Sequence, residues 1–226
     1  MTPPFVLTPR LSLCAEFVRN GINVCDIGTD HAYLPIYLAY IGKAKSALAC
    51  DINPGPLERG KQNIEKYNME NTVKTRLSDG LLNVSGEEAD DLIIAGMGGV
   101  LIAKIISEAQ WLMDSNKRLI LQPMTRSEVL REYLFENGFT IEREECVLSE
   151  KRIYSVMLVK YIGGKIPFTN KDKYLGKIIK ADNPVLFEMY LDKIKSALIK
   201  KADGFKISGN TDKAEEICKI INELEC

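Results

Sequence analysis

The chain has 226 residues, of which 46% are hydrophobic and 27% are charged, and its formal net charge is −1. It is long enough for one α/β domain with a smaller appendage, and its apolar content is sufficient to bury a core. The longest apolar runs, such as residues 92–95 and 119–121, are far too short to span a membrane, and no basic segment leads into an apolar stretch at the N-terminus. We therefore expect a cytoplasmic protein without a membrane span or a secretory signal.

The first predicted element is an amphipathic helix over residues 8–18. Between residues 22 and 160, short β-branched apolar runs alternate with helical patterns. The predicted strands cover Asn23–Ile27, Ser46–Asp51, Val73–Leu77, Asp91–Ala95, Arg118–Gln122, Thr140–Leu148 and Ile153–Tyr161. The helices predicted between them cover Tyr33–Ile41, Pro54–Tyr67, Val100–Trp111 and Ser127–Asn137.

This alternation predicts an α/β fold with a mostly parallel sheet, because strands separated by helices of this length form βαβ crossovers. Only residues 149–152 separate the last two strands, so these predict a terminal antiparallel hairpin. A Rossmann-like sheet of seven strands with an antiparallel terminal strand is typical of class I methyltransferases, although the pattern alone does not decide the class.

Gly163-Gly164 marks a break after the predicted sheet, so we expect one domain over residues 1–162 and a helical arm over residues 163–226. The helices predicted in the arm cover Lys171–Ala181, Pro184–Lys201 and Thr211–Leu224.

The last two helices repeat apolar residues at every third or fourth position, which predicts a coiled-coil-like antiparallel hairpin. Asn183 can cap the first of them, with Pro184 at the first helical position, and Asp203-Gly204 is the predicted turn. The apolar stripes can pack within the hairpin or between chains, so the arm is compatible with a monomer or a weak dimer.

The six cysteines contain no pair at C-x-x-C spacing, and they are expected to be reduced thiols in a reducing compartment. They are Cys14, Cys25, Cys50, Cys146, Cys218 and Cys226. Because the chain has a single histidine and no clustered ligands, no metal site is proposed. The arm is weakly basic and the preceding segment weakly acidic, which permits a polyanionic partner but is weak evidence for one.

The segment that follows the first predicted strand reads Asp-Ile-Gly-Thr-Asp-His-Ala-Tyr. Ligands of open parallel sheets bind beyond the carboxyl ends of the strands. A dinucleotide site would need G-x-G-x-x-G there, but only Gly28 is present, with Asp30 and Tyr33 in place of the other glycines. A carboxylate would repel a pyrophosphate and would suit the ammonium group of a methionine moiety. The segment therefore favours S-adenosylmethionine over NAD or FAD.

Two further aspartates follow neighbouring strands. Asp51 ends the second strand, where an acidic side chain accepts hydrogen bonds from ribose hydroxyls. Asp79 follows the third strand, where it can meet the adenine amine. Each aspartate alone is equally well explained as a cap of the next helix or turn, but together with Asp30 they indicate a cofactor site.

These motifs resemble the bacterial tRNA (adenine-22-N1)-methyltransferase family of the TrmK type. The resemblance is carried by Arg10-Leu11, the segment from Asp26 to Pro35, Asp79-Gly80-Leu81, Ile94–Gly99, Leu121-Gln122-Pro123, Asn137-Gly138-Phe139 and Glu150-Lys151 with Tyr154. Thr29 and Met124 are small departures from the family pattern. The resemblance implies methylation of N1 of adenine 22 in tRNA, with an arm that helps to grip the tRNA.

The residues expected to hold the cofactor lie at the strand ends: Asp26, Gly28, Asp30, His31, Asp51, Ile52, Asp79, Gly80, Gly96, Met97 and Gly98. Methyl transfer to a ring nitrogen needs alignment and electrostatic stabilisation rather than a strong base. Asp30 is the candidate catalytic residue, and holding the cofactor ammonium is its competing role. The glycines at 96–99 replace the Asn/Asp-Pro-Pro-aromatic motif of enzymes that methylate exocyclic amines, which fits a ring nitrogen target.

Five residues are candidates for contacts with the RNA. Arg10, Arg126 and Arg131 are expected to reach phosphates, and Tyr33 and Met97 to pack on the base. Solvated arginines and core packing of Tyr33 and Met97 are the alternatives, and lysines 200, 201 and 206 are weaker candidates. Other interpretations of the chain are a methyltransferase for another RNA site or a small molecule, and a noncatalytic RNA-binding protein.

Overall fold

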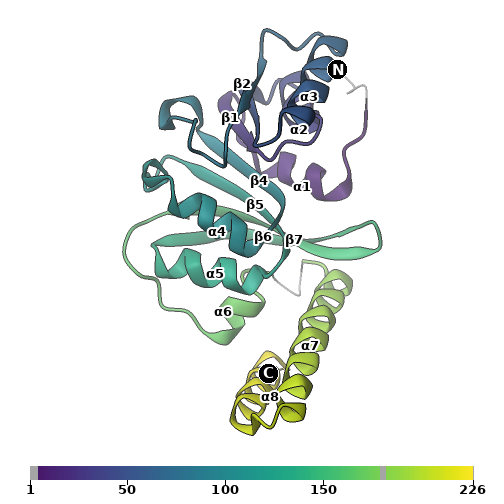
Figure 1. The fold of residues 1–226 in the computed structure, drawn as a ribbon, viewed down its shortest axis with the longest axis vertical. Coiled ribbons are helices and arrows are strands. Elements are labelled where there is room, and N and C mark those ends of the chain that lie inside the picture. Colours follow the sequence, from purple (N-terminus) through teal and green to yellow (C-terminus); the bar gives the residue numbers. More distant parts are fainter. Residues whose placement is uncertain (1–4, 179–181, 226) are drawn as a thin grey trace.

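A computed structural model describes residues 5–178 and 182–225, and its centre is a seven-stranded sheet (Figure 1). The strand order is β3-β2-β1-β4-β5-β7-β6. The strands are β1 (Ile22–Ile27), β2 (Ala44–Asp51), β3 (Val73–Leu77), β4 (Asp91–Gly98), β5 (Arg118–Thr125), β6 (Phe139–Ser149) and β7 (Arg152–Tyr161). The chain reverses strand order beside β1, because β1 pairs with both β2 and β4 in parallel.

The antiparallel strand is β7, which lies between β5 and β6 and pairs antiparallel with both. All other pairings in the sheet are parallel. The predicted seven-stranded, mostly parallel Rossmann-like architecture with an antiparallel terminal strand is therefore confirmed.

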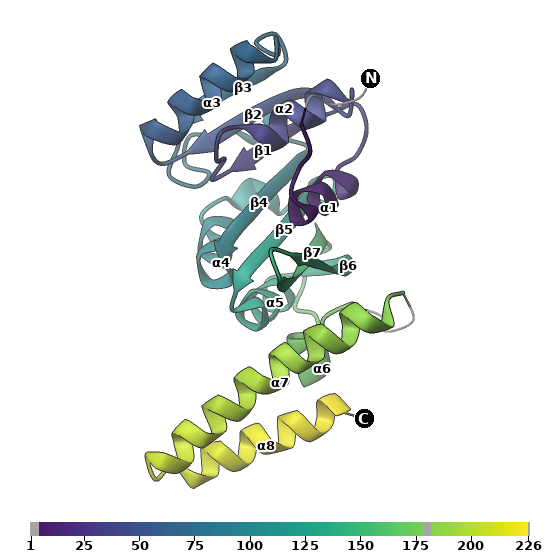
Figure 2. The same cartoon turned by 90° about the vertical axis from the view of Figure 1, so that its right-hand side faces the viewer.

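Helices cover both faces of the sheet (Figures 1 and 2). The helices are α1 (Pro9–Phe17), α2 (Tyr33–Tyr40), α3 (Pro54–Lys66), α4 (Gly99–Ser107), α5 (Ser127–Glu136), α6 (Asn170–Tyr174), α7 (Pro184–Ile207) and α8 (Thr211–Glu225). Alternate strand residues face opposite layers: Leu92 packs with α4 and α5, whereas Ile93 packs with α1 and α2. Among the described residues no helix is long and apolar enough to cross a bilayer.

The last two helices of the arm, α7 and α8, pack against each other as an antiparallel hairpin beside the β7–β6 end of the sheet (Figure 2). Their apolar stripes meet in one cluster that includes Leu198, Ala202, Ile217 and Leu224. The predicted turn at Asp203-Gly204 is wrong, because α7 continues through it to Ile207. A glycine inside a helix costs only about 1 kcal/mol, which burial of the neighbouring Ala202 offsets.

The first arm helix is also shorter than predicted. It ends at Tyr174, and Gly176 adopts φ +63° directly after it. A left-handed glycine at this place terminates a helix. Residues 175–178 of the predicted helix are therefore not helical, and residues 179–181 and Cys226 lie outside the described residues. The five described cysteines form no disulfide, and Cys14, Cys25 and Cys50 are buried.

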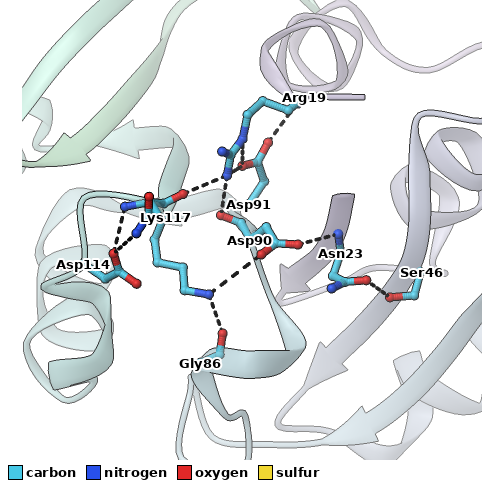
Figure 3. A network of polar contacts seen from close by, with 9 residues as sticks. Arg19, Asn23, Ser46, Gly86, Asp90, Asp91, Asp114 and Lys117 are labelled. Carbon is cyan, nitrogen blue, oxygen red and sulfur yellow. Dashed lines mark hydrogen bonds and ion pairs between the residues drawn. The ribbon is translucent and has the colours of Figure 1, made fainter. Parts of the chain in front are cut away.

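The amino ends of β1, β4 and β5 are held by a polar network (Figure 3). The carboxylate of Asp91, fully buried at the start of β4, accepts hydrogen bonds of 2.8 Å from the backbone N and from Nε of Arg19. Asp90 accepts from the backbone N of Asn23 at 2.9 Å, and Lys117 forms an ion pair with it at 3.9 Å. At the amino ends of the strands, opposite the predicted site, the buried and partly buried charges are therefore paired or hydrogen-bonded, which stabilises the sheet.

We expect Asp91→Ala to lower the free energy of unfolding by about 2 kcal/mol, because it removes two charge-assisted hydrogen bonds. Urea unfolding followed by circular dichroism measures the change. Asp114→Ala, which removes a half-buried carboxylate from the adjoining turn, is the matched control and should cost less than about 1 kcal/mol. Equal losses for the two variants would contradict the role of Asp91.

Candidate functional site

The turn after β1, the end of β4 and helix α1 enclose a cleft of about 240 Å³. Its lining residues are Arg10, Leu11, Asp26, Gly28, Asp30, Leu34, Ala95 and Gly96. Five of the residues predicted from sequence thus come together here: Arg10, Asp26, Gly28, Asp30 and Gly96. The cleft lies beyond the carboxyl ends of β1 and β4, where the strand order reverses.

The turn after β1 favours glycine because Gly28 has φ +74°, a conformation that other residues rarely adopt. The flexible end of the Met97 side chain lies where a Cβ of residue 28 would be. The backbone N–H groups of Gly28 and Thr29 both donate to the carbonyl oxygen of Cys50, at 2.9 Å. Met97, from the end of β4, therefore covers the glycine turn and also packs against the core below the sheet.

His31 and Ala32 continue the turn in the left-handed conformation, with φ of 62° and 57°. Two such residues in succession are strained, and the strain is offset by the Asn63 side chain, which donates to the His31 carbonyl at 2.9 Å. The geometry brings Nε2 of His31 to 3.1 Å from Oδ1 of Asp30. The Asp30 side chain is 77% exposed, so its carboxylate is available to a ligand.

The ring of His31 stacks on Tyr33, with centroids 5.8 Å apart, and Phe5 meets Tyr33 edge-on at 5.1 Å. Tyr33 retains 38% exposure. Its position allows packing as well as contact with a base, so the predicted contact between Tyr33 and RNA stays a prediction.

Asp26 is the buried acid of the cleft, with 6% exposure. Burial raises the pKa of its carboxyl to about 6, the nearby hydroxyl of Thr29 opposes this shift, and the negative charge of Asp51 adds to it. An acid with such a pKa is ionised only partly in mildly acidic solution, and a cationic ligand in the cleft would favour its ionised form.

Gln122 is a site residue that the sequence analysis did not assign, although its motif contributed to the family resemblance. It is fully buried at the end of β5, and its Oε1 accepts from Arg10 at 3.2 Å and from the backbone N of Gly96 at 3.1 Å. It therefore holds Arg10 at the cleft. The signal in the sequence is a glutamine that directly follows the apolar run of a buried strand.

The remaining predicted cofactor residues lie at the neighbouring strand ends without lining this cleft. The Asp51 carboxylate accepts from the backbone N of Asn53 at 2.7 Å, and Ile52 beside it is 57% exposed. Asp79 is exposed after β3, and Gly80 has φ +52°. Their position beside β1 leaves room for an extended ligand along the sheet edge, and their contacts with it stay predictions.

The ends of β4 and β5 approach each other closely. A Cβ at Gly99 would overlap the carbonyl oxygen of Arg126, and Gly98 lies against Thr125. Arg126 begins α5 in the left-handed conformation, and its Nε forms an ion pair of 2.8 Å with Glu128. Because the Arg126 side chain is 61% exposed, it stays a candidate for phosphate contact.

The prediction that Arg131 contacts phosphate is wrong, because its side chain is fully buried. Its guanidinium pairs with the equally buried Glu144 at 2.6 Å and donates to the hydroxyl of Tyr190 on α7 at 2.8 Å. It also donates to the carbonyl oxygens of Lys173 and Tyr174. Burial lowers the pKa of Arg131, but Glu144 and Tyr190 more than offset this and keep it charged. Arg131 thus fastens the arm to the sheet.

The described residues contain no group of three or more His, Cys, Asp or Glu side chains placed to hold a metal ion. The cleft instead combines two carboxylates, a glycine turn and an arginine. This arrangement can bind a small ligand that carries both a cationic and an anionic group, as an amino acid moiety does.

Comparison with known proteins agrees with a site for such a ligand. Residues 7–157 match the methyltransferase domain family. The tRNA (adenine(22)-N(1))-methyltransferase of Bacillus subtilis is 36% identical over 154 residues, which are 68% of this chain and 65% of that protein, slightly less than two thirds of its length.

Solved structures match over nearly the whole chain. A Streptococcus pneumoniae protein, assigned as a tRNA (m1A22) methyltransferase and solved with S-adenosyl-L-methionine, is 32% identical with a TM-score of 0.80, covering 95% of this chain and 97% of that one. The B. subtilis m1A22 tRNA methyltransferase TrmK is 29% identical with a TM-score of 0.80, covering 97% of both chains.

We expect Arg131→Ala to lower the free energy of unfolding by about 3–5 kcal/mol, because it leaves the buried Glu144 carboxylate without a counter-charge. Urea unfolding and proteolysis at the start of the arm measure the change. Arg131→Met combined with Glu144→Leu removes both charges and should recover much of the stability. A loss below about 1 kcal/mol for Arg131→Ala would show that the pair does not hold the arm.

Proposed function

The chain belongs to the bacterial tRNA (adenine-22-N1)-methyltransferase family, and from that premise we propose that it transfers a methyl group from S-adenosylmethionine to N1 of adenine 22 in tRNA. The single observation that carries the proposal is the acidic glycine turn after β1, in which Asp26, Gly28 and Asp30 face one cleft at the switch in strand order. Such a turn suits a methionine moiety and would repel a pyrophosphate.

The cleft fits the amino acid end of the cofactor. Its carboxylates, Asp26 and Asp30, would attract the ammonium group, and Arg10 would attract the carboxylate. Asp51 and Asp79 at the next strand ends would then face the ribose and the adenine, with Gly80, Ile52 and the Gly96–Gly98 segment around them. S-adenosylmethionine supplies an electrophilic methyl group on a sulfonium.

The reaction does not require the protein to act as a strong base, because N1 of adenine has a free lone pair at neutral pH. The positive charge that appears on the purine must be stabilised, and the exposed Asp30 carboxylate is placed to do so. His31 stands 3.1 Å from that carboxylate and would fix its orientation. Holding the cofactor ammonium is the alternative role of Asp30.

The arm would grip the tRNA while the sheet holds the cofactor. We propose that the protein acts as a monomer or weak dimer in the cytoplasm, where its substrate is found. Support for a monomer comes from the apolar stripes of α7 and α8, which pack on each other within the hairpin.

We expect the purified protein to form N1-methyladenosine in an unmodified tRNA transcript with adenine at position 22. Mass spectrometry of the digested RNA measures the product, and the same transcript with guanine at position 22 is the control. Methylation that persists in the control would contradict the assigned position, and measurable cofactor binding without a methylated nucleoside would contradict the RNA substrate.

We expect Asp30→Asn to lower kcat by about tenfold or more while the Kd for S-adenosylhomocysteine changes less than about threefold, if its charge stabilises the methylated base. Single-turnover kinetics and calorimetry measure the two quantities. A raised Kd with little change in the single-turnover rate would assign Asp30 to the cofactor ammonium instead.

We expect S-adenosylhomocysteine to bind about tenfold more tightly at pH 7 than at pH 5. The Asp26 carboxyl, with its pKa of about 6, is largely protonated at pH 5, and only its ionised form attracts the ammonium. Calorimetry at a fixed ionic strength measures the Kd. Asp26→Asn should bind more weakly and lose this dependence, and a variant that keeps it would show that another group titrates.

A further inference from the structure

A second cleft, of about 540 Å³, lies between the sheet and the arm. One wall is the segment Met124–Glu128, which joins the end of β5 to the start of α5. The opposite wall is the face of α7 that carries Lys193, Ile194, Ala197, Leu198 and Lys201, and Tyr174 closes one side. No residue of the cofactor cleft lines it.

The interior of this cleft is apolar and its rim is cationic. Met124, Ile194, Leu198 and the ring of Tyr174 supply the apolar surface. Arg126, Lys193 and Lys201 lie around it, and Glu128 is the one carboxylate among the described lining residues. The arginine is paired with Glu128, whereas Lys201 is exposed. A neighbouring hollow adds Lys151 and Arg152 from the β6–β7 turn.

The arm wall is held in place. Lys193 donates to the carbonyl oxygen of Ile153 on β7 at 2.8 Å and lies over the rings of Tyr154 and Tyr190. Tyr190, on the same helix, binds the buried Arg131. The cleft is therefore a preformed feature of the fold.

Buried contacts through Gln122 and the pairing of β4 with β5 relate this cleft to the cofactor cleft. Gln122 binds Arg10 and Gly96 at the cofactor cleft through Oε1, and its Nε2 donates to the sulfur of Met124 at 3.6 Å. Thr125 pairs with Gly98 at the end of β4. The two clefts therefore lie at the carboxyl ends of neighbouring strands, on the same edge of the sheet.

We propose that this cleft between β5 and α7 binds an unstacked nucleotide of the substrate RNA, with its base against the apolar walls and its phosphate beside Lys201. This inference rests on the proposed function. A target base must leave its stack to reach a methyl donor, and its neighbours lose stacking partners when it does. An apolar slot with an aromatic wall and a cationic rim replaces that stacking and neutralises the phosphate.

Two pairs of variants on α7 test the proposal. Ala197→Trp fills the cleft, and Ser196→Trp places the same bulk one residue away, outside it. Lys201→Gln removes the cation at the rim, and Lys200→Gln removes an exposed lysine that does not line the cleft. None of the four positions lines the cofactor cleft, and the binding of S-adenosylhomocysteine to each variant verifies that the cofactor domain is intact.

The measurement is the fluorescence anisotropy of a labelled unmodified tRNA transcript, titrated with each variant from 50 to 200 mM salt. Ala197→Trp should weaken binding at least about fivefold, which is the low end of the contribution of one stacked base, while Ser196→Trp binds like the wild type. Lys201→Gln should reduce the slope of log K against log salt by about 1, and Lys200→Gln should leave it unchanged.

Equal binding by Ala197→Trp and Ser196→Trp, or equal weakening by both, would overturn the proposal. So would equal salt slopes for the two lysine variants. Because binding is measured without turnover, these results are independent of the methylation assay. Wild-type protein that binds tRNA but forms no N1-methyladenosine would contradict the proposed function and leave the comparison of variants readable.

Discussion

The buried ion pair between Arg131 and Glu144 lies where α5, β6, the end of α6 and α7 meet. Both side chains are fully inaccessible to solvent, and a charge buried in this way is tolerated only when all of its hydrogen bonds are made. The guanidinium makes them with β6, with the carbonyl groups that end α6 and with Tyr190 of α7. Satisfaction of this charge therefore helps to fix α7 against the sheet, and α7 forms one wall of the cleft between β5 and α7.

The amino and carboxyl ends of the parallel strands differ in their electrostatic character. At the amino ends of the strands, Asp91 and Asp90 are matched by Arg19, Lys117 and backbone N–H groups, which stabilises the fold (Figure 3). At the carboxyl ends, Asp26 is buried with a raised pKa, Asp30 is exposed, and the backbone at His31 and Ala32 is strained. Unmatched acids and strained turns are costly for stability, so their concentration at the edge where parallel sheets bind ligands fits a site for a cationic ligand.

Several expectations from the sequence failed, and each failed for the same kind of reason. A surface arginine and the buried Arg131 look identical in a list of residues, since the partners of Arg131 lie 13 and 59 positions away in the chain. Gly204 resembles a turn residue, but the packing of α7 against α8 carries the helix through it. The sequence does not distinguish Lys200 from Lys201 as a candidate for RNA contact, whereas in the structure only Lys201 of the two lines the cleft.

The sequence by itself determined the order of strands and helices, the antiparallel end of the sheet and the acidic glycine turn, because periodicity, strand-end carboxylates and turn residues act over a few neighbouring positions. It also carries the motifs on which the family resemblance depends. The tertiary structure decided which charges are buried and how far α7 extends. It also decided which lysine lies at the cleft between β5 and α7, and that Gln122 contacts residues of both clefts. These properties depend on contacts between residues distant in the chain, and burial, unlike periodicity, is set by what the rest of the molecule places nearby.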